Sequence, residues 1–122
     1  MFMSNISGRA EAPLEFLVGA LRAAGEPSRL RALALLAQGE LAVGELAQAL
    51  DQSQPRVSRH LKVLTEIGLA ERAPEGAWVF YRLPPEGGFA RALVESLVAA
   101  LDPADPALLR DRERLEIGRA HV

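Results

Sequence analysis

The sequence predicts a mainly α-helical (α+β) domain of the winged helix-turn-helix class, with about five to six helices and one two-stranded β-hairpin. Two observations predict this class. Apolar residues recur at helical spacing in successive segments before Gly68, and the last two of these segments are joined by a very short connection. After Gly68 the apolar residues alternate, which is typical of strands, so a hairpin is expected directly after the helices.

The first helix is expected from Pro13 to Ala24, after a flexible N-terminal segment of residues 1–12. Pro27 opens the second helix, because the first turn of a helix has no partner for the N–H that proline lacks. A short third helix repeats the spacing i, i+3, i+4, i+7 with Val43, Leu46, Ala47 and Leu50.

The fourth helix follows a two-residue connection and is the most informative segment of the chain. Ser53 is a good N-cap, and Pro55 lies in the first turn. Apolar residues at helical spacing share one face, which is expected to be buried: Val57, Leu61 and Leu64. The opposite face is polar and basic, and no acidic residue interrupts residues 52–65.

This basic face indicates an anionic partner. The chain as a whole has a formal charge of −2, so the positive charge is local, and duplex DNA is the natural candidate. Two short helices joined by a tight turn, the second of them basic, form a helix-turn-helix. The alternative is a basic face that is merely solvated, as on many helices.

The hairpin is expected from a strand over residues 69–73, a turn at Pro74, Glu75 and Gly76, and a second strand over residues 77–83. The two prolines that follow break the sheet. A last long helix then carries apolar residues at helical spacing: Phe89, Leu93, Val94, Leu97 and Leu101.

Length and composition limit the alternatives. At 122 residues, 49% of them apolar, the chain predicts one compact domain over residues 13–101, followed by a charged C-terminal helix or connector over residues 102–122. No apolar run approaches the roughly 18 residues of a membrane span, so no membrane partner and a cytoplasmic location are expected.

The sequence contains no recognisable catalytic pattern. Gly87 and Gly88 follow two prolines, so they lack the strand before them that a nucleotide-binding loop requires. No Ser/His/Asp or Cys/His set can be assembled, and an enzyme is therefore not expected. The remaining alternative to DNA binding is a winged helix that docks to proteins, which would expose apolar groups rather than arginines.

Several spaced motifs in the same order make the chain similar to the ArsR/SmtB family of winged helix-turn-helix repressors. The resemblance covers about residues 14–101. The matching segments are LRAAGEPSRLR (21–31), ELAVGELA (40–47), QSQPRVSRHLKVL (52–64), GL (68–69) and GAWVFYRL (76–83).

The resemblance implies a homodimer built by the first and last helices of the domain. It places the basic helix of each subunit in the major groove of an imperfectly palindromic operator, with the wing beside it. Members usually repress transcription and release DNA when an inducer binds. The expected dimer contacts are Leu14, Leu17, Leu21, Leu93, Leu97 and Leu101.

The basic helix supplies most of the expected DNA contacts. The side chains able to bond to base edges in the major groove are Gln54, Ser58, Arg59 and His60. Arg56 and Lys62 are expected on phosphates, and Arg82 and the backbone around Gly76 meet DNA beside the wing. For His60 and Arg82 the alternative is a structural role inside the domain.

The chain departs from the family pattern at the known metal positions. Metal-sensing members place two cysteines at positions that correspond to Ala42 and Gly44, and the chain has no cysteine at all. Other members use ligands on the last helix, and residues 86–101 contain no histidine. No metal site and no cofactor are therefore expected, and the inducer would be an unidentified small molecule. Ala77 replaces a basic residue common at the wing tip, which implies a weaker wing contact.

Two interpretations remain for residues 102–122. The segment is similar to the connector of longer family members, in which a methyltransferase that uses S-adenosylmethionine follows. The chain would then be the DNA-binding module of such a fusion. Alternatively, the segment is a short C-terminal helix that packs on the dimer through Leu108, Leu109 and Leu115.

Overall fold

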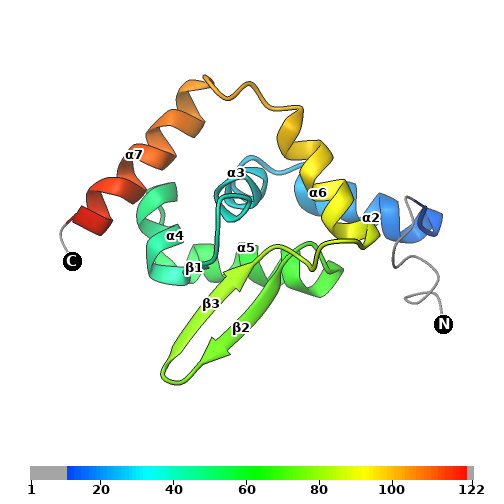
Figure 1. Cartoon of the computed structure of the whole chain (residues 1–122), viewed down its shortest axis with the longest axis horizontal. Helices are drawn as coiled ribbons and strands as arrows, with labels where there is room; N and C mark the ends of the chain where they lie inside the picture. Colours follow the sequence, from blue (N-terminus) through cyan, green and yellow to red (C-terminus); the bar gives the residue numbers. More distant parts are fainter. Residues whose placement is uncertain (1–10, 121–122) are drawn as a thin grey trace.

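The computed structural model describes residues 11–120, so all but the end of the expected flexible segment 1–12 lies outside them, as does His121. The described part contains six helices and a three-stranded antiparallel sheet, which confirms the predicted class (Figure 1). The elements are α2 (Leu14–Ala24), α3 (Pro27–Leu36), β1 (Leu41–Ala42), α4 (Val43–Leu50), α5 (Gln54–Ile67), β2 (Glu71–Glu75), β3 (Trp78–Arg82), α6 (Phe89–Ala99) and α7 (Pro106–Ala120).

Helix α3 lies at the centre of the molecule and contacts α2, α4, α5, α6 and α7 (Figure 1). Its first turn is fixed by Glu26, whose carboxylate oxygens accept hydrogen bonds from the N–H groups of Ser28 and Arg29, both at 3.1 Å. Pro27 occupies the first helical position, as expected. The helices around α3 are therefore assembled on an element whose start is well defined.

The sheet is larger than the predicted two-stranded hairpin. Strand β1 pairs with β3, so the order is β1-β3-β2. The predicted first strand over residues 69–73 is shifted, because β2 runs over Glu71–Glu75 and includes Pro74, which was expected in the turn. Pro74 is tolerated because β2 is an edge strand. The turn itself consists of Gly76, which has a positive φ of 61°, and Ala77.

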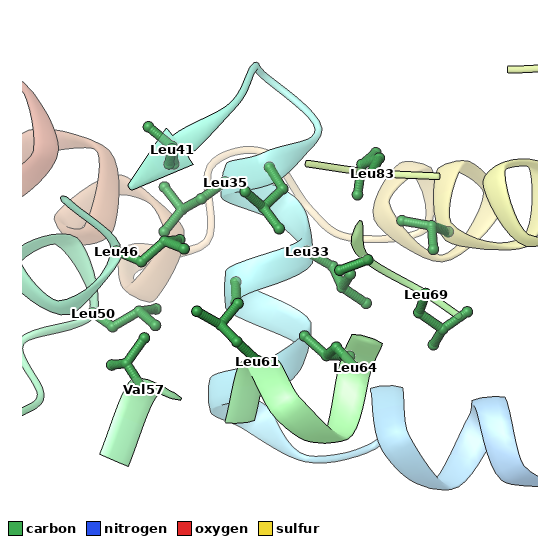
Figure 2. Packing of buried hydrophobic residues seen from close by; sticks show 14 of the residues in the cluster. Leu33, Leu35, Leu41, Leu46, Leu50, Val57, Leu61, Leu64, Leu69 and Leu83 are labelled. Atoms are coloured by element: carbon green, nitrogen blue, oxygen red, sulfur yellow. The ribbon is translucent and has the colours of Figure 1, made fainter. Parts of the chain in front are cut away.

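The core is formed mainly by leucines from several helices (Figure 2). Leu33 of α3 is fully buried, and the predicted apolar face of α5 is buried with it. Leu69, which was expected in a strand, is also fully buried immediately after α5. Because one face of α5 is held in this core, its opposite face must point away from the domain.

Helix α7 packs against α4 and α3. It is 15 residues long, which exceeds the short helix expected here. Leu115 belongs to the buried core and Leu108 is half-buried, whereas Leu109, also expected as an apolar anchor, is 49% exposed. Sequence reasoning missed Asp111 of α7. Its carboxylate is buried, although an acidic residue of a charged helix is expected to be exposed.

No helix within residues 11–120 is both long and apolar enough to cross a membrane.

Candidate nucleic-acid interface

The outward face of α5 is the candidate interface. Ser53 caps this helix by accepting a hydrogen bond from the N–H of Arg56 at 3.4 Å, and Gly68 ends the helix with a φ of 87°. The polar side chains of this face are all exposed: Gln54, Arg56, Ser58, Arg59 and Lys62. Within residues 11–120, the side chains of the three basic residues among them form no ion pair. Their positive charge is therefore available to a partner.

The turn between α4 and α5 is held by hydrogen bonds from elsewhere in the chain. Asp51 adopts the left-handed conformation with a φ of 55°, which ends α4 and redirects the chain. Gln52 donates from Nε2 to Ser28 Oγ at 2.7 Å. The last carbonyls of α4 also accept bonds, from Arg114 Nε to Ala49 at 2.8 Å and from Arg31 Nη2 to Leu50 at 3.2 Å. The position of α5 therefore depends on α3 and α7 as well as on α4.

His60 differs from the other expected base contacts, because it lies against the start of α3. Its Nδ1 is 3.5 Å from Glu26 Oε2 and 3.4 Å from Arg29 Nη1, and its side chain is only 18% exposed. Burial alone raises the pKa of Glu26, but bonds from the Ser28 and Arg29 N–H groups, with nearby His60 and Arg29, lower it below 4.5. This geometry favours the structural alternative for His60.

Arg82, the basic residue expected to contact DNA beside the wing, is already paired with acidic side chains. Arg82 lies 3.2 Å from Glu71 Oε1 and 3.7 Å from Glu40 Oε1 through its Nε and Nη1 atoms. Its charge is therefore already balanced by two carboxylates, although the side chain remains exposed. Gly76 is exposed at the tip, and Trp78 beside it is 68% exposed.

The six leucines expected at the dimer interface fall into two groups. On α2, Leu14 is 77% exposed and Leu21 is also exposed, whereas Leu17 is half-buried. The others, Leu93, Leu97 and Leu101, are half-buried, and the first two pack against the core.

Sequence reasoning missed Val18 as an interface candidate. This residue is exposed and follows Leu14 by four positions, so Leu14, Val18 and Leu21 share one apolar stripe on α2.

Among the described residues, no group of three or more His, Cys, Asp and Glu side chains is placed to hold a metal ion. Ala42 and Gly44, the positions of the cysteines in metal-sensing members, lie at the start of α4.

Comparison with known proteins agrees with a helix-turn-helix whose second helix, α5, has an exposed basic face. The profile of the family "Bacterial regulatory protein, arsR family" matches residues 26–72, from the cap of α3 into β2. The chain is similar to the arsenical resistance operon repressor of Escherichia coli strain K12, with 51% identity over 61 residues, which are 49% of this chain and 52% of the relative. The chain thus spans about half the length of such sequence relatives.

Similar solved structures match a larger share of this chain than the sequence relatives do. The transcriptional repressor BigR from Xylella fastidiosa is 36% identical with a TM-score of 0.61, and the match covers 68% of this chain and 80% of BigR. A homodimeric winged helix-turn-helix DNA-binding domain from Mycobacterium bovis, described as a possible ArsR-family regulator, is 34% identical with a TM-score of 0.63. That match covers 71% of this chain and 80% of the domain.

Proposed function

The chain belongs to the arsR family of bacterial regulatory proteins, and from this premise we propose that it is a homodimeric transcriptional repressor that binds an imperfectly palindromic DNA operator. The observation that carries the proposal is the outward face of α5. This face combines exposed amide, hydroxyl and guanidinium groups, and no acidic residue interrupts it. Such a face fits the major groove in both charge and hydrogen-bonding capacity.

The role of each residue in DNA binding follows from its position on α5 or the wing and from the hydrogen-bond donors that it leaves unpaired. Gln54, Ser58 and Arg59 contact base edges, while Arg56 and Lys62 bind phosphates and fix the position of the helix. His60 contributes mainly by holding α5 against the start of α3, since it contacts Glu26 and Arg29. The wing contributes less than α5, through the backbone at Gly76 and through Arg82 when it exchanges a carboxylate for a phosphate.

The dimer forms through the exposed stripe of α2 together with α6. The stripe includes Leu14, whose side chain is 77% exposed. Exposure of an apolar stripe to water is unfavourable, so burial of the stripe against a second copy of the chain is expected. The similar Mycobacterium bovis domain is homodimeric, which supports a dimer for this chain as well. Two α5 helices in such a dimer would lie about 34 Å apart, or a small multiple of this, to meet successive major grooves.

The protein acts in the cytoplasm, where its DNA target lies, and no catalytic activity is proposed. Its signal is a small molecule other than a metal ion. The packing of α7 on α3 and α4 supports a role for residues 106–120 as a helix of this domain.

The decisive experiment measures the fluorescence anisotropy of a labelled duplex from the region upstream of its gene, with competitor DNA and at two salt concentrations. Wild-type protein should bind tightly, with a logarithmic salt slope of roughly −0.9 per phosphate contacted. Arg59→Ala should weaken specific binding by about 1–3 kcal/mol if Arg59 contacts a base. Arg110→Ala is the matched control, because Arg110 is an exposed arginine of α7 outside this face.

Equal, weak binding by wild type, Arg59→Ala and Arg110→Ala would contradict the proposal. It would support the alternative in which the winged helix docks to another protein.

A further inference from the structure

A small cavity lies between α3, the end of α6 and α7, away from the outward face of α5. Its volume is about 90 Å³. Most of its wall is apolar and comes from all three elements and the segment after α6: Ala34, Leu35, Val98, Leu101 and Leu108. Since water occupies about 30 Å³ per molecule in the liquid, the cavity can hold a fragment of about the bulk of three waters.

The polar part of the cavity wall is positively charged. Arg31 donates from Nε and Nη2 to the two carboxylate oxygens of Asp111 at 2.8 and 2.6 Å, and Arg112 donates from Nη2 to the carbonyl of Pro103 at 2.7 Å. Asp111 also accepts a bond from Arg114 at 2.8 Å. Arg31 and Arg114 therefore share one carboxylate, and Arg112 has no acidic partner among the described residues. This leaves a net positive charge beside an apolar wall.

Both arginines of the wall retain hydrogen-bond donors. Within residues 11–120, Arg31 Nη1 and the Nε and Nη1 groups of Arg112 have no hydrogen-bond partner. A planar guanidinium with free N–H groups matches a carboxylate in both shape and charge.

We propose that this cavity binds a short-chain aliphatic monocarboxylate and that this ligand is the inducer. The alkyl chain fits the apolar wall, and the carboxylate bonds to Arg112 and Arg31. The cavity volume limits the enclosed alkyl part to about three or four carbons, so the acid has about four or five carbons with its carboxylate. This inference rests on the proposed repressor function for its regulatory part, whereas the binding site stands independently of it.

Arg31 connects the cavity to the helix-turn-helix. The same Nη2 atom that contacts Asp111 donates to the carbonyl of Leu50, the last residue of α4, at 3.2 Å. A ligand carboxylate competes for this guanidinium and displaces α7 from α3. Because the turn into α5 starts at the next residue, the ligand changes the orientation of α5 relative to the dimer helices. A ligand that binds the two arrangements unequally shifts their populations.

The binding test uses isothermal titration calorimetry of the full chain with sodium valerate, without DNA. Wild-type protein should bind valerate at least ten times more tightly than valeramide, which has nearly the same shape without the charge. Arg112→Gln should weaken valerate binding at least tenfold, and Ala34→Leu, which fills the cavity, should abolish it. Arg110→Gln is the matched control on the same helix and should bind as wild type does.

Thermal unfolding of each variant establishes that it folds. Absence of valerate binding to folded wild-type protein, or equal binding by Arg112→Gln, would overturn the site.

The regulatory test repeats the anisotropy measurement with saturating valerate. Operator affinity should fall at least tenfold for wild type and remain unchanged for Arg112→Gln. Unchanged operator affinity in wild type that binds valerate would overturn the inducer role while leaving the site in place. A protein that binds valerate but no DNA would contradict the proposed function, so the two failures are distinguishable.

Discussion

The side chain of Arg31 contacts two other helices at once. It bonds to the Asp111 carboxylate of α7 and to the last carbonyl of α4. The hydrogen bonds to Asp111 raise the pKa of Arg31, although burial opposes this. Asp111 is 1% exposed, so its charge is stabilised almost entirely by Arg31 and Arg114.

Loss of the Asp111 carboxylate is expected to destabilise the protein. Asp111→Ala leaves two guanidinium groups without their partner. Both retain some access to water, so the cost should be about 2–3 kcal/mol, below that of a fully buried pair. Urea denaturation measures this change. Glu113→Ala, on the exposed side of α7, should stay within about 0.5 kcal/mol of wild type. Equal stability of the two variants would show that Asp111 does not hold α7.

Arginines that look equivalent in the sequence differ in the structure in whether an acidic side chain pairs with them. Arg59 is exposed without an acidic partner among the described residues, whereas Arg82 lies between Glu40 and Glu71. The two acidic residues lie far from Arg82 in the chain, and only the pairing of β1 and β2 with β3 brings them close. The sequence therefore predicts the basic face of α5, but it does not show that Arg82 is paired with two acidic residues.

At the scale of the elements, α5 and α3 have ends that local chemistry determines. Ser53, Pro55 and Gly68 are standard start and stop residues, and they predicted the bounds of α5. Strand β1 is only two residues long, too short to show an alternating pattern, so it could not be predicted. Helix α7 shows almost no separation of apolar and polar faces. The side of α7 that is buried could therefore not be predicted from the sequence.

The cap of α3 should make stability depend on pH. The pKa of Glu26 is lowered in the folded protein, so its contribution is fully present above the ordinary value of 4.5 and is lost as the pH falls through the folded pKa. At pH 7, Glu26→Gln should be less stable than wild type by up to about 1 kcal/mol. The difference should shrink below pH 4.5, as urea denaturation at both pH values can measure.

Glu66→Gln provides the comparison for this effect, because Glu66 is an exposed carboxylate of α5. A Glu26→Gln difference that stays constant with pH would show that ionised Glu26 does not stabilise α3.

At the scale of the whole molecule, α2 and α6 lie together at one end and α7 covers the other (Figure 1). Phe16 of α2 and Phe89 of α6 pack edge to face with ring centroids 5.8 Å apart, which links the two helices of the expected dimer interface. The exposed stripe of α2 leaves this end of the molecule apolar.

The double variant Leu14→Glu and Leu21→Glu should disrupt the dimer, because burial of two carboxylates without partners is unfavourable. Sedimentation equilibrium should show self-association weakened at least tenfold, with a corresponding loss of operator affinity. Leu109→Glu changes an exposed leucine of α7 and should leave both properties unchanged. A double variant that remains dimeric would place the interface elsewhere.

The sequence by itself determined the order of the helices, the two faces of α5 and the position of the hairpin. These features depend on apolar spacing and on capping residues, which act over a few neighbouring positions. The tertiary structure alone decided which charges remain free, that Pro74 lies in an edge strand, and that α7 packs on α3 through Asp111. Those outcomes depend on contacts between residues far apart in the chain, such as Arg31 and Asp111, for which local spacing carries no signal.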